Sequence, residues 1–349
     1  MGVLLRAVMR WVILRRLLAY AIGCVYAVPV VSMVFVSLLR SRGAILRKKR
    51  HDKKPECLED PEYGEHRLAQ VKDVHIHYVV AGNEGKPLMV FVHGFPEFWF
   101  SWRHQIKEFK KNYRVVAIDQ RGYNTSSKPL GVLNYTVDKL VDDVSQLITA
   151  LGYNKCILVG HDWGGVTCWG VAMKYPDLVE RLIIMNAPHP STFLPYLSST
   201  WTQFRKSWYM FLFQLPYLPE FLYRSDDMRS LNRIFLGRRA GVKSGKMSKE
   251  DVEAYKYVFS AKGSFTFPIN YIRAMTRTRR IISADDQVTC PTLVLWGDAD
   301  QFLDTGLIQL AAPYVPKLDV QIIKGASHWV QMDQPEAVNS HISDFLVRK

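Results

Sequence analysis

Short apolar runs alternate with amphipathic segments along most of the chain after about residue 74. The runs are VHIHYVV, LMVFVHG, YRVVAID, KCILVGHD, RLIIMNA and TLVLWGD, and several of them lack alternating polar positions. Such runs, rich in β-branched residues, are typical of strands buried on both faces of a parallel sheet. Between them, TVDKLVDDVSQLITALG has apolar residues at spacings of three and four and closes at Gly152, which predicts a helix. Strands that alternate with helices predict an α/β fold with a doubly wound, mostly parallel sheet.

The alternation stops between about Pro190 and Asp285, and the strand-like run TLVLWGD follows this interval. The interval has a largely helical pattern, so we predict a helical cap at about residues 190–285, inserted into an α/β domain of residues 55–349. Aromatic side chains in such a cap first form its core, and its inner face then lines an apolar pocket. The aromatic residues are Trp201, Phe204, Trp208, Tyr209, Phe211, Phe213, Tyr217, Phe221, Tyr255, Tyr257, Phe265, Phe267 and Tyr271.

One apolar segment near the amino terminus predicts a membrane span. Residues 17–39 carry no charge, and a helix of this length crosses a hydrocarbon core of about 30 Å. A cleaved signal peptide is the alternative, but its apolar region is shorter and is followed by a small-residue cleavage site. We therefore interpret residues 1–54 as a membrane anchor followed by a basic linker.

The charges that flank this segment predict its orientation. Four arginines precede it, and eight Lys or Arg residues follow it before residue 55. By the positive-inside rule we expect a single-pass membrane protein, of the endoplasmic reticulum, whose catalytic domain faces the cytosol. Two sequons, at Asn124 and Asn134, matter only if the domain is luminal. The five cysteines lack metal or disulfide-framework spacing, which is in keeping with a reducing compartment.

The formal net charge of +14 over 349 residues suggests a nucleic-acid-binding protein until it is placed along the chain. Residues 1–54 hold twelve Lys and Arg against one acidic residue, and the rest holds 34 basic and 31 acidic residues. The main domain is therefore nearly neutral, and we find no nucleic-acid-binding motif. The hydrophobic content of 48% supports a substantial core instead.

The stretch VGHDWGGV places Asp162 between an apolar strand and a helix. Gly160 and Gly164 stand two residues on either side of it, and small residues let such a turn close tightly around a strained central residue. The spacing matches the G-x-S-x-G nucleophile turn, with aspartate in place of serine. We expect the Asp162 carboxylate to stand above the sheet edge as a nucleophile.

Three further segments complete the predicted site. HGFPEFW follows another buried strand, and the backbone N–H groups of Phe95 and Trp163 are expected to form an oxyanion hole. WGDADQF places Asp300 just past a strand end, and GASHW places His328 in a loop after VQIIKG. The chain order of nucleophile, acid and base is that expected after such a turn. Asp298 is the alternative to Asp300 for the acid.

An aspartate at this turn predicts a two-step reaction. With a reference pKa of about 3.9 it is already ionised, so it can attack an electrophilic sp³ carbon and form an alkyl ester. His328, oriented by Asp300, is then free to activate water against the carbonyl carbon of that ester. A ring oxygen as leaving group needs an acid such as tyrosine, whereas a halide needs indole N–H groups. Neither reaction requires a metal or an organic cofactor.

Together, HGFPEFW, GHDWGG, the WGxxD acid and GASHW resemble the epoxide hydrolases of the α/β-hydrolase fold, over roughly residues 60–345. The amino-terminal anchor makes the chain most similar to the membrane-bound animal epoxide hydrolase 3 and 4 group. This resemblance implies hydrolysis of apolar, lipid-derived epoxides to vicinal diols, with water and membrane lipid as the other partners. Haloalkane and haloacetate dehalogenases share the aspartate nucleophile and stay an alternative. A catalytically weak lipid-binding or scaffolding protein of the same fold is a second one.

The resemblance also implies two cap tyrosines that bind the epoxide oxygen. The first matches Tyr209 in SWYMFLFQLP. The second falls in PINYIR, where Ile272 occupies the position of the family tyrosine and Tyr271 precedes it. One residue on a regular helix is a rotation of about 100°, so core packing is the alternative to a catalytic role for Tyr271.

Overall fold

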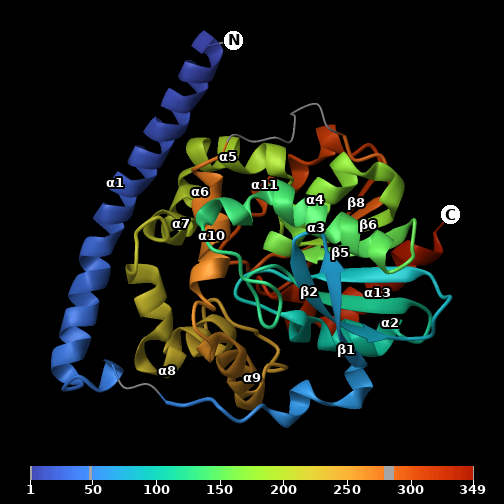
Figure 1. Ribbon diagram of the computed structural model, residues 1–349, viewed down its shortest axis with the longest axis horizontal. Coiled ribbons are helices and arrows are strands. Elements are labelled where there is room, and N and C mark those ends of the chain that lie inside the picture. The colour runs from blue at the N-terminus through green and yellow to red at the C-terminus, as the bar shows by residue number, and fades with distance from the viewer. Residues whose placement is uncertain (1, 47–48, 279–286, 349) are drawn as a thin grey trace.

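The computed structural model describes residues 2–46, 49–278 and 287–348. Its centre is an eight-stranded sheet with the strand order β1-β2-β4-β3-β5-β6-β7-β8 (Figure 1). β3 to β8 run parallel, whereas β2 pairs antiparallel with both β1 and β4. The strands are β1 (Glu65–Val71), β2 (Val74–Ala81), β3 (Leu88–Val92), β4 (Arg114–Asp119), β5 (Cys156–His161), β6 (Val179–Met185), β7 (Thr292–Gly297) and β8 (Leu318–Ile323).

This architecture confirms the predicted α/β class and the mostly parallel sheet. The six runs predicted as strands lie in β2 to β7, and the central β3, β5 and β7 are buried at every position. The pattern does not predict β1, whose sequence EHRLAQV is exposed at five of seven positions. An edge strand with almost no buried face carries no alternation of apolar and polar residues, so its sequence gives no signal.

Helices cover both faces of the sheet. α3 (Val137–Ala150) and α4 (Trp163–Lys174) pack on one face, and α2 (Arg103–Phe109) and α13 (Pro335–Val347) pack on the other. Each face has its own buried apolar cluster, and the cluster on the α2 and α13 side continues into the helical insertion. Burial of one large apolar side chain contributes about 1.5–3 kcal/mol, so these two clusters dominate the stability of the domain.

Six helices lie in the insertion between β6 and β7, among the described residues. Figure 1 shows them between the sheet and the long amino-terminal helix. The predicted carboxyl-terminal boundary of the cap, near residue 285, lies outside the described residues. The backbone from Ser225 to Met228 is non-helical, so α8 is two short helices joined at a kink. The helices are α5 (Pro190–Ser199), α6 (Trp201–Lys206), α7 (Trp208–Leu212), α8 (Leu218–Leu236), α9 (Lys249–Ser260) and α10 (Thr266–Met275).

The amino-terminal helix α1 (Gly2–Arg40) runs along the outside of the cap (Figure 1). Its segment Val12–Arg40 is long and apolar enough to cross a membrane, by length and composition. The short helix η1 (Ala44–Leu46) follows it, and the linker positions 47 and 48 lie outside the described residues. Two short helices near the carboxyl terminus, α11 (Gly306–Gln309) and α12 (Val330–Asp333), complete the α-helices.

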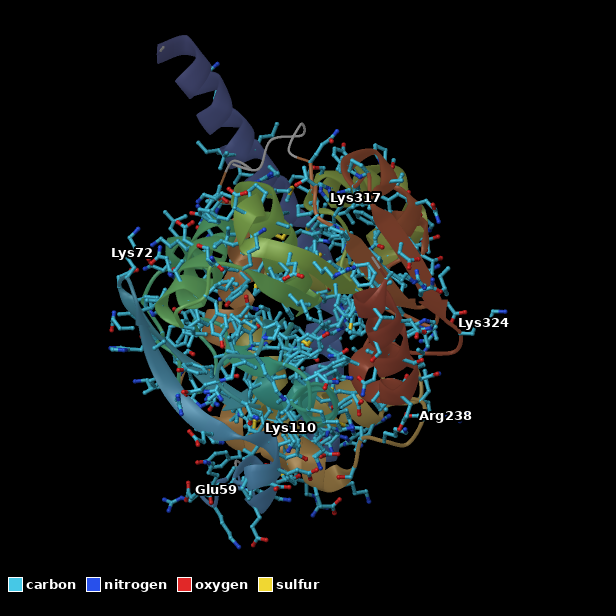
Figure 2. All side chains as sticks on the ribbon, turned by 90° about the vertical axis from the view of Figure 1, so that its right-hand side faces the viewer. Glu59, Lys72, Lys110, Arg238, Lys317 and Lys324 are labelled. Carbon is cyan, nitrogen blue, oxygen red and sulfur yellow. The ribbon has the colours of Figure 1, made fainter. Side chains whose placement is uncertain are left out.

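Charged side chains spread over the surface of the domain. Figure 2 shows Lys72, Lys110, Lys317 and Lys324 at well-separated points of its periphery. This dispersion agrees with the near-neutral balance of the sequence beyond residue 54. All five cysteines are free thiols, and Cys156, Cys168 and Cys290 are buried.

Candidate active site

The carboxyl ends of five strands bring four predicted site residues, and Asn186, which was not predicted, to one edge of the sheet. Phe95 follows β3, Asp162 follows β5, Asn186 follows β6, Asp300 follows β7 and His328 follows β8. Ligands of open α/β sheets bind at this edge, because parallel strands end there together and their loops converge.

The turn at Asp162 is a tight, strained junction between β5 and α4. Asp162 has φ 50° and ψ −119°, a conformation that L-residues with a side chain rarely adopt. A Cβ at Gly164 would lie 2.0 Å from the Val92 carbonyl oxygen, and a Cβ at Gly94 would lie 2.4 Å from the Cβ of Asp162. Only glycine fits at these positions, and the close packing restricts the orientation of the Asp162 side chain.

Two groups contact the Asp162 carboxylate directly. The backbone N–H of Phe95 donates to Oδ1 at 2.8 Å, and Nε2 of His328 lies 3.5 Å from Oδ2. Trp163 is the first residue of α4, so its N–H has no acceptor within the helix. Burial alone raises the pKa of Asp162, but the hydrogen bond and charge of His328 outweigh burial and hold that pKa below its usual value. The carboxylate is therefore ionised at neutral pH.

His328 stands between two carboxylates. Its Nδ1 lies 2.7 Å from Oδ2 of Asp300, which also accepts a hydrogen bond from the side-chain amide of Asn186 at 2.7 Å. The other Asp300 oxygen accepts the backbone N–H groups of Phe302 and Leu303. These bonds fix the acid and orient the imidazole so that Nε2 faces Asp162.

Asp298, the alternative acid, lies elsewhere. It is exposed, and its Oδ1 accepts the backbone N–H of Gly325 at 2.6 Å. The structure thus brings Asp300, and not Asp298, to His328.

The paired carboxylates also determine the protonation of His328. Burial lowers its pKa, but the charge of Asp300 and the hydrogen bond with Asp162 outweigh burial and raise the pKa to about 10. Asp300 itself has a pKa below its usual value, because the imidazolium and the Asn186 amide counter the effect of its burial. The resting site is a buried Asp162–His328–Asp300 array with a charged imidazolium between two carboxylates.

The sequence reasoning missed a buried pair beneath this array, Glu97 and His161. Nδ1 of His161 lies 2.6 Å from Glu97 Oε2, and its Nε2 lies 2.8 Å from the carbonyl oxygen of His328. Glu97 Oε2 also accepts the N–H of Gly94. Both hydrogen-bond partners of the ring are acceptors. The pair ties the Phe95 loop to the His328 loop. Glu97 ends the motif HGFPE and His161 lies in GHD, so the two motifs contained the signal that could have identified this pair.

Two cavities meet at Asp162, Trp163 and Tyr209. The larger one, of about 440 Å³, is also lined by His328. The smaller one, of about 150 Å³, reaches Thr136 and Asp138. Burial and the negative charges of Asp162 and Asp300 raise the pKa of Tyr209 well above its ordinary value. Tyr209 thus presents a protonated phenol to the nucleophile.

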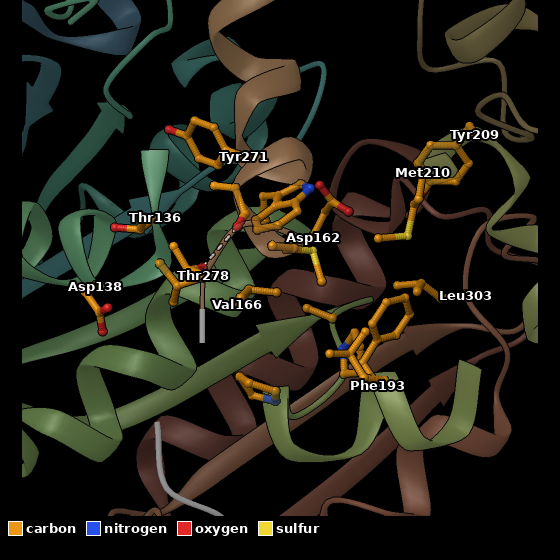
Figure 3. A pocket seen from close by; sticks show the side chains of 18 of the residues that line it. Thr136, Asp138, Asp162, Val166, Phe193, Tyr209, Met210, Tyr271, Thr278 and Leu303 are labelled. Atoms are coloured by element: carbon orange, nitrogen blue, oxygen red, sulfur yellow. Dashed lines mark hydrogen bonds between the residues drawn. The ribbon is translucent and has the colours of Figure 1, made fainter. Parts of the chain in front are cut away.

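The hydroxyl of Tyr271 does not reach Asp162. It donates to the carbonyl oxygen of Arg121 at 2.7 Å, and the ring packs edge-on against Trp163. Figure 3 shows this hydroxyl turned away from the Asp162 carboxylate. The side chain is only 1% exposed and borders the smaller cavity, but its hydroxyl is occupied by Arg121, so the structure favours packing over the predicted catalytic role. Tyr271 is one residue before the position on α10 that faces the larger cavity. The helix is not rotated in a way that would bring the Tyr271 side chain to that cavity instead.

That cavity-facing position is Ile272, and a different tyrosine lines the same cavity. Tyr223 on α8 packs edge-on against Phe95 at 5.5 Å, and Ile272 and Tyr209 are further lining residues. Burial and the charge of Asp162 raise the pKa of Tyr223. No motif contains this residue, so it could not be identified from the sequence.

Comparisons with known proteins agree with this geometry. A family model described as alpha/beta hydrolase fold matches residues 87–335. Epoxide hydrolase 1 of Caenorhabditis elegans is 44% identical over 335 residues, which cover 95% of this chain and 82% of that protein. Epoxide hydrolase 4 of Homo sapiens is 41% identical over 342 residues, which cover 95% of this chain and 94% of that protein.

A crystal structure of a Bacillus megaterium epoxide hydrolase in complex with an inhibitor is also similar. It aligns with a TM-score of 0.74 at 35% identity and covers 81% of this chain and 100% of that chain. These findings confirm the family to which the four sequence motifs point. The chain belongs to the epoxide hydrolase family of the α/β-hydrolase fold.

Proposed function

We propose that the protein hydrolyses apolar epoxides to vicinal diols through an ester on Asp162. The observation that carries the proposal is an ionised carboxylate held at a strained turn, with one oxygen at the Phe95 N–H and the other 3.5 Å from His328. A charged carboxylate needs no base before it attacks, so the histidine is free for the second step.

In the first step Asp162 attacks one ring carbon. A bond forms between the carboxylate oxygen and this carbon, and the bond from the carbon to the ring oxygen breaks. The released alkoxide takes the phenolic proton of Tyr209, whose raised pKa keeps it protonated at neutral pH. The product is a hydroxyalkyl ester of Asp162.

We propose Tyr223 as the second phenol on the ring oxygen. Ile272 leaves the family position without a hydroxyl, and Tyr223 enters the same cavity from another cap helix. Within the described residues, neither the Tyr209 nor the Tyr223 hydroxyl forms a hydrogen bond with a protein group. The Tyr271 hydroxyl, in contrast, donates to the carbonyl oxygen of Arg121. Two unoccupied donors facing one apolar cavity suit an oxygen that the substrate supplies.

In the second step His328 activates water. Esterification removes the charge of Asp162, so one of the two carboxylates that raise the pKa of His328 is lost. The imidazolium then gives up a proton, which restores the Tyr209 phenol, and the neutral imidazole accepts a proton from the water that adds to the ester carbonyl carbon. The Phe95 and Trp163 N–H groups hold the resulting oxyanion. On its collapse the leaving alkoxide takes the proton from His328 and departs as the diol, and the carboxylic acid of Asp162 returns its proton to the imidazole.

One of the indole groups that line the larger cavity is not free to bind a halide. Trp329 lines the larger cavity, but its N–H donates to the carbonyl oxygens of Ala240 and Ile234. This indole therefore does not offer the free donor that a halide needs, whereas the cavity offers two phenols.

We further propose that α1 anchors the enzyme in the endoplasmic reticulum membrane with the catalytic domain in the cytosol. The basic residues that follow the apolar segment support this orientation. The Asn124 sequon supports it as well, because its side-chain nitrogen donates to Asp119 and is not free to carry a glycan.

A single-turnover reaction in heavy-oxygen water tests the chemistry. Excess full-length enzyme is mixed with a long-chain alkyl epoxide, and the diol and the peptide containing Asp162 are analysed by mass spectrometry. We expect the heavy oxygen on Asp162 and an unlabelled first diol. Heavy oxygen in that diol would mean direct attack by water and would reject the ester. In the His328→Gln variant the unhydrolysed ester should accumulate on the same peptide.

A further inference from the structure

The cavity that contains the nucleophile extends to the amino-terminal helix. Val30, Met33, Val34 and Ser37 of α1 line the same cavity as Asp162 and His328, and Ile45 of η1 lines it too. A segment that sequence reasoning assigns only to anchoring is thus one wall of the active-site cavity.

α1 is firmly packed against the cap beside this cavity. Val30 is buried in one apolar cluster with Leu212 and Leu215. At Gly23 the helices approach so closely that a Cβ would lie 2.5 Å from the Phe211 carbonyl oxygen. Arg15, further towards the amino terminus, donates to the carbonyl oxygens of Met275 and Thr278. The contact therefore extends along α1 from Arg15 to the cavity wall.

The opposite side of α1 presents large apolar side chains to the surroundings. Val25, Val28 and Phe35 are 70%, 67% and 60% exposed. A contiguous apolar surface of this kind is stable only when lipid or protein covers it. Since the cap contacts α1 along the apolar segment itself, lipid covers only the outer face of the helix, and the cap meets the membrane beside it.

The neighbouring cap surface has the composition of a membrane interface. Trp201, Trp208 and Tyr217 are all exposed, and Trp208 contacts Tyr26 of α1. Such amphipathic rings favour the boundary between headgroups and acyl chains. Arg229 and Arg233 line the same cavity from α8 and are exposed, where they can meet anionic headgroups.

We infer that the larger cavity is a lateral portal, through which a long-chain epoxide dissolved in the bilayer passes between α1 and α8 to Asp162. The inference rests on the proposed function, which supplies the reaction at Asp162 where the portal ends. Moving an alkyl chain from lipid into water is unfavourable in proportion to its length, so a direct route from lipid avoids this cost. The smaller cavity, which is lined by Arg15 of α1 and reaches Thr136 and Asp138, is a second approach to Asp162, and we assign it to water and soluble substrates.

Two substrates and two variants of the full-length protein in phospholipid vesicles test the portal. Val34→Trp fills the cavity wall, whereas the matched control Val36→Trp adds the same bulk at a position that is 43% exposed and outside the cavity lining. We expect Val34→Trp to lower kcat/KM at least about tenfold for a vesicle-dissolved alkyl epoxide and less than about twofold for a water-soluble aryl epoxide. The control should change neither. Equal losses on both substrates, or no loss on either, would overturn the portal.

A photoreactive probe separates this inference from the proposed function. A long-chain diazirine without an epoxide is dissolved in the vesicles and activated, and labelled peptides are identified. Labels on Tyr223 and Trp329 in the parent that are reduced in Val34→Trp would support the portal. If the parent shows these labels but turns over no epoxide, the proposed function alone fails. Labels confined to the outer face of α1, in an enzyme that hydrolyses the soluble epoxide, would overturn the portal alone.

Discussion

The charge on Asp162 organises the residues around it. With a serine at this turn, the histidine would have one carboxylate beside it and could be neutral. Here the carboxylates of Asp162 and Asp300 together hold His328 as an imidazolium. The ion pairs are buried, so their strength depends on both carboxylates remaining charged. Loss of either charge changes the protonation of the imidazole, and this is what formation of the ester does.

The first prediction at this scale concerns the pKa of His328. Asp162→Asn imitates the uncharged ester, so we expect it to lower this pKa from about 10 towards the ordinary histidine value. NMR titration of the imidazole resonances measures the change. Asp298→Asn is the matched control, because Asp298 is exposed and, among the described residues, its side chain accepts a hydrogen bond only from the Gly325 N–H. An unchanged pKa in Asp162→Asn would contradict the electrostatic account.

The same shift predicts how stability depends on pH. The folded-state pKa of His328 is raised, so its stabilising contribution is complete below the unfolded value of about 6.5 and is lost as the pH rises towards 10. The lowered pKa values of Asp162 and Asp300 have the opposite consequence, because their contribution is lost on acidification below about pH 4. Thermal denaturation of the parent should show Tm falling between pH 7 and 10, and falling less in Asp162→Asn. A flat Tm over this range would contradict the assignment.

The cap tyrosines give the second residue-scale prediction. Tyr209→Phe should lower kcat/KM about 10²-fold and Tyr223→Phe about tenfold, since each removes a donor to the ring oxygen. Tyr271→Phe should change activity less than about twofold while it loses a buried hydrogen bond worth about 1 kcal/mol of stability. Steady-state kinetics and thermal denaturation separate the two effects.

A compensating variant sharpens that test. Ile272→Tyr restores a phenol at the family position, so it should recover activity in the Tyr223→Phe background. Equal kinetics for Tyr223→Phe and the parent would remove Tyr223 from the proposal.

At the scale of elements, the junction from β5 to α4 depends on backbone contacts that leave no space for a side chain. Gly164→Ala places a Cβ 2.0 Å from the Val92 carbonyl oxygen, so β3 and α4 must separate. We expect a loss of at least about 4 kcal/mol in the free energy of unfolding, together with loss of activity. Gly85→Ala is the control, because its Cβ meets open space and only its positive φ is strained, at about 1 kcal/mol. Thermal denaturation compares the two, and similar Tm values would contradict the close-packed junction.

Helix rotation decided which aromatic side chains face the substrate cavity. In α10, Ile272 lines the larger cavity, whereas the hydroxyl of Tyr271, one residue earlier, is held by Arg121. In α8, the kink from Ser225 to Met228 begins two residues after Tyr223. Neither orientation can be read from local sequence, because each is fixed by the packing of the cap on the sheet domain.

At the scale of the whole molecule, the orientation in the membrane predicts the fate of the two sequons. We expect no glycosidase-sensitive mass shift at Asn124 or Asn134 when the full chain is expressed in animal cells. The Asn124 amide donates to the buried Asp119, and Asn134 donates to the carbonyl oxygen of Leu130. A glycosylation tag placed before residue 1 is the control: a glycan on the tag means that α1 crosses the bilayer, and its absence means that α1 lies along the membrane surface with the cap beside it. A glycan on either asparagine would place the domain on the luminal side.

The sequence by itself determined the sheet and the nucleophile. The strands β2 to β7 are mostly buried on both faces, so their apolar runs are visible locally, and Asp162 stands between glycines whose small size the turn requires. Asp300 and His328 also follow from the chain order, because strand ends converge at one edge of a parallel sheet.

Only the tertiary structure decided how the cap and α1 complete the site. It turned the Tyr271 hydroxyl away from Asp162, placed Tyr223 in the wall of the larger cavity, and made Val34 of an apparent anchor part of that wall. The physical reason is that these side chains come together through contacts between segments far apart in the chain. Such contacts depend on how whole helices are rotated and docked, whereas a strand or a glycine turn is specified by its immediate neighbours.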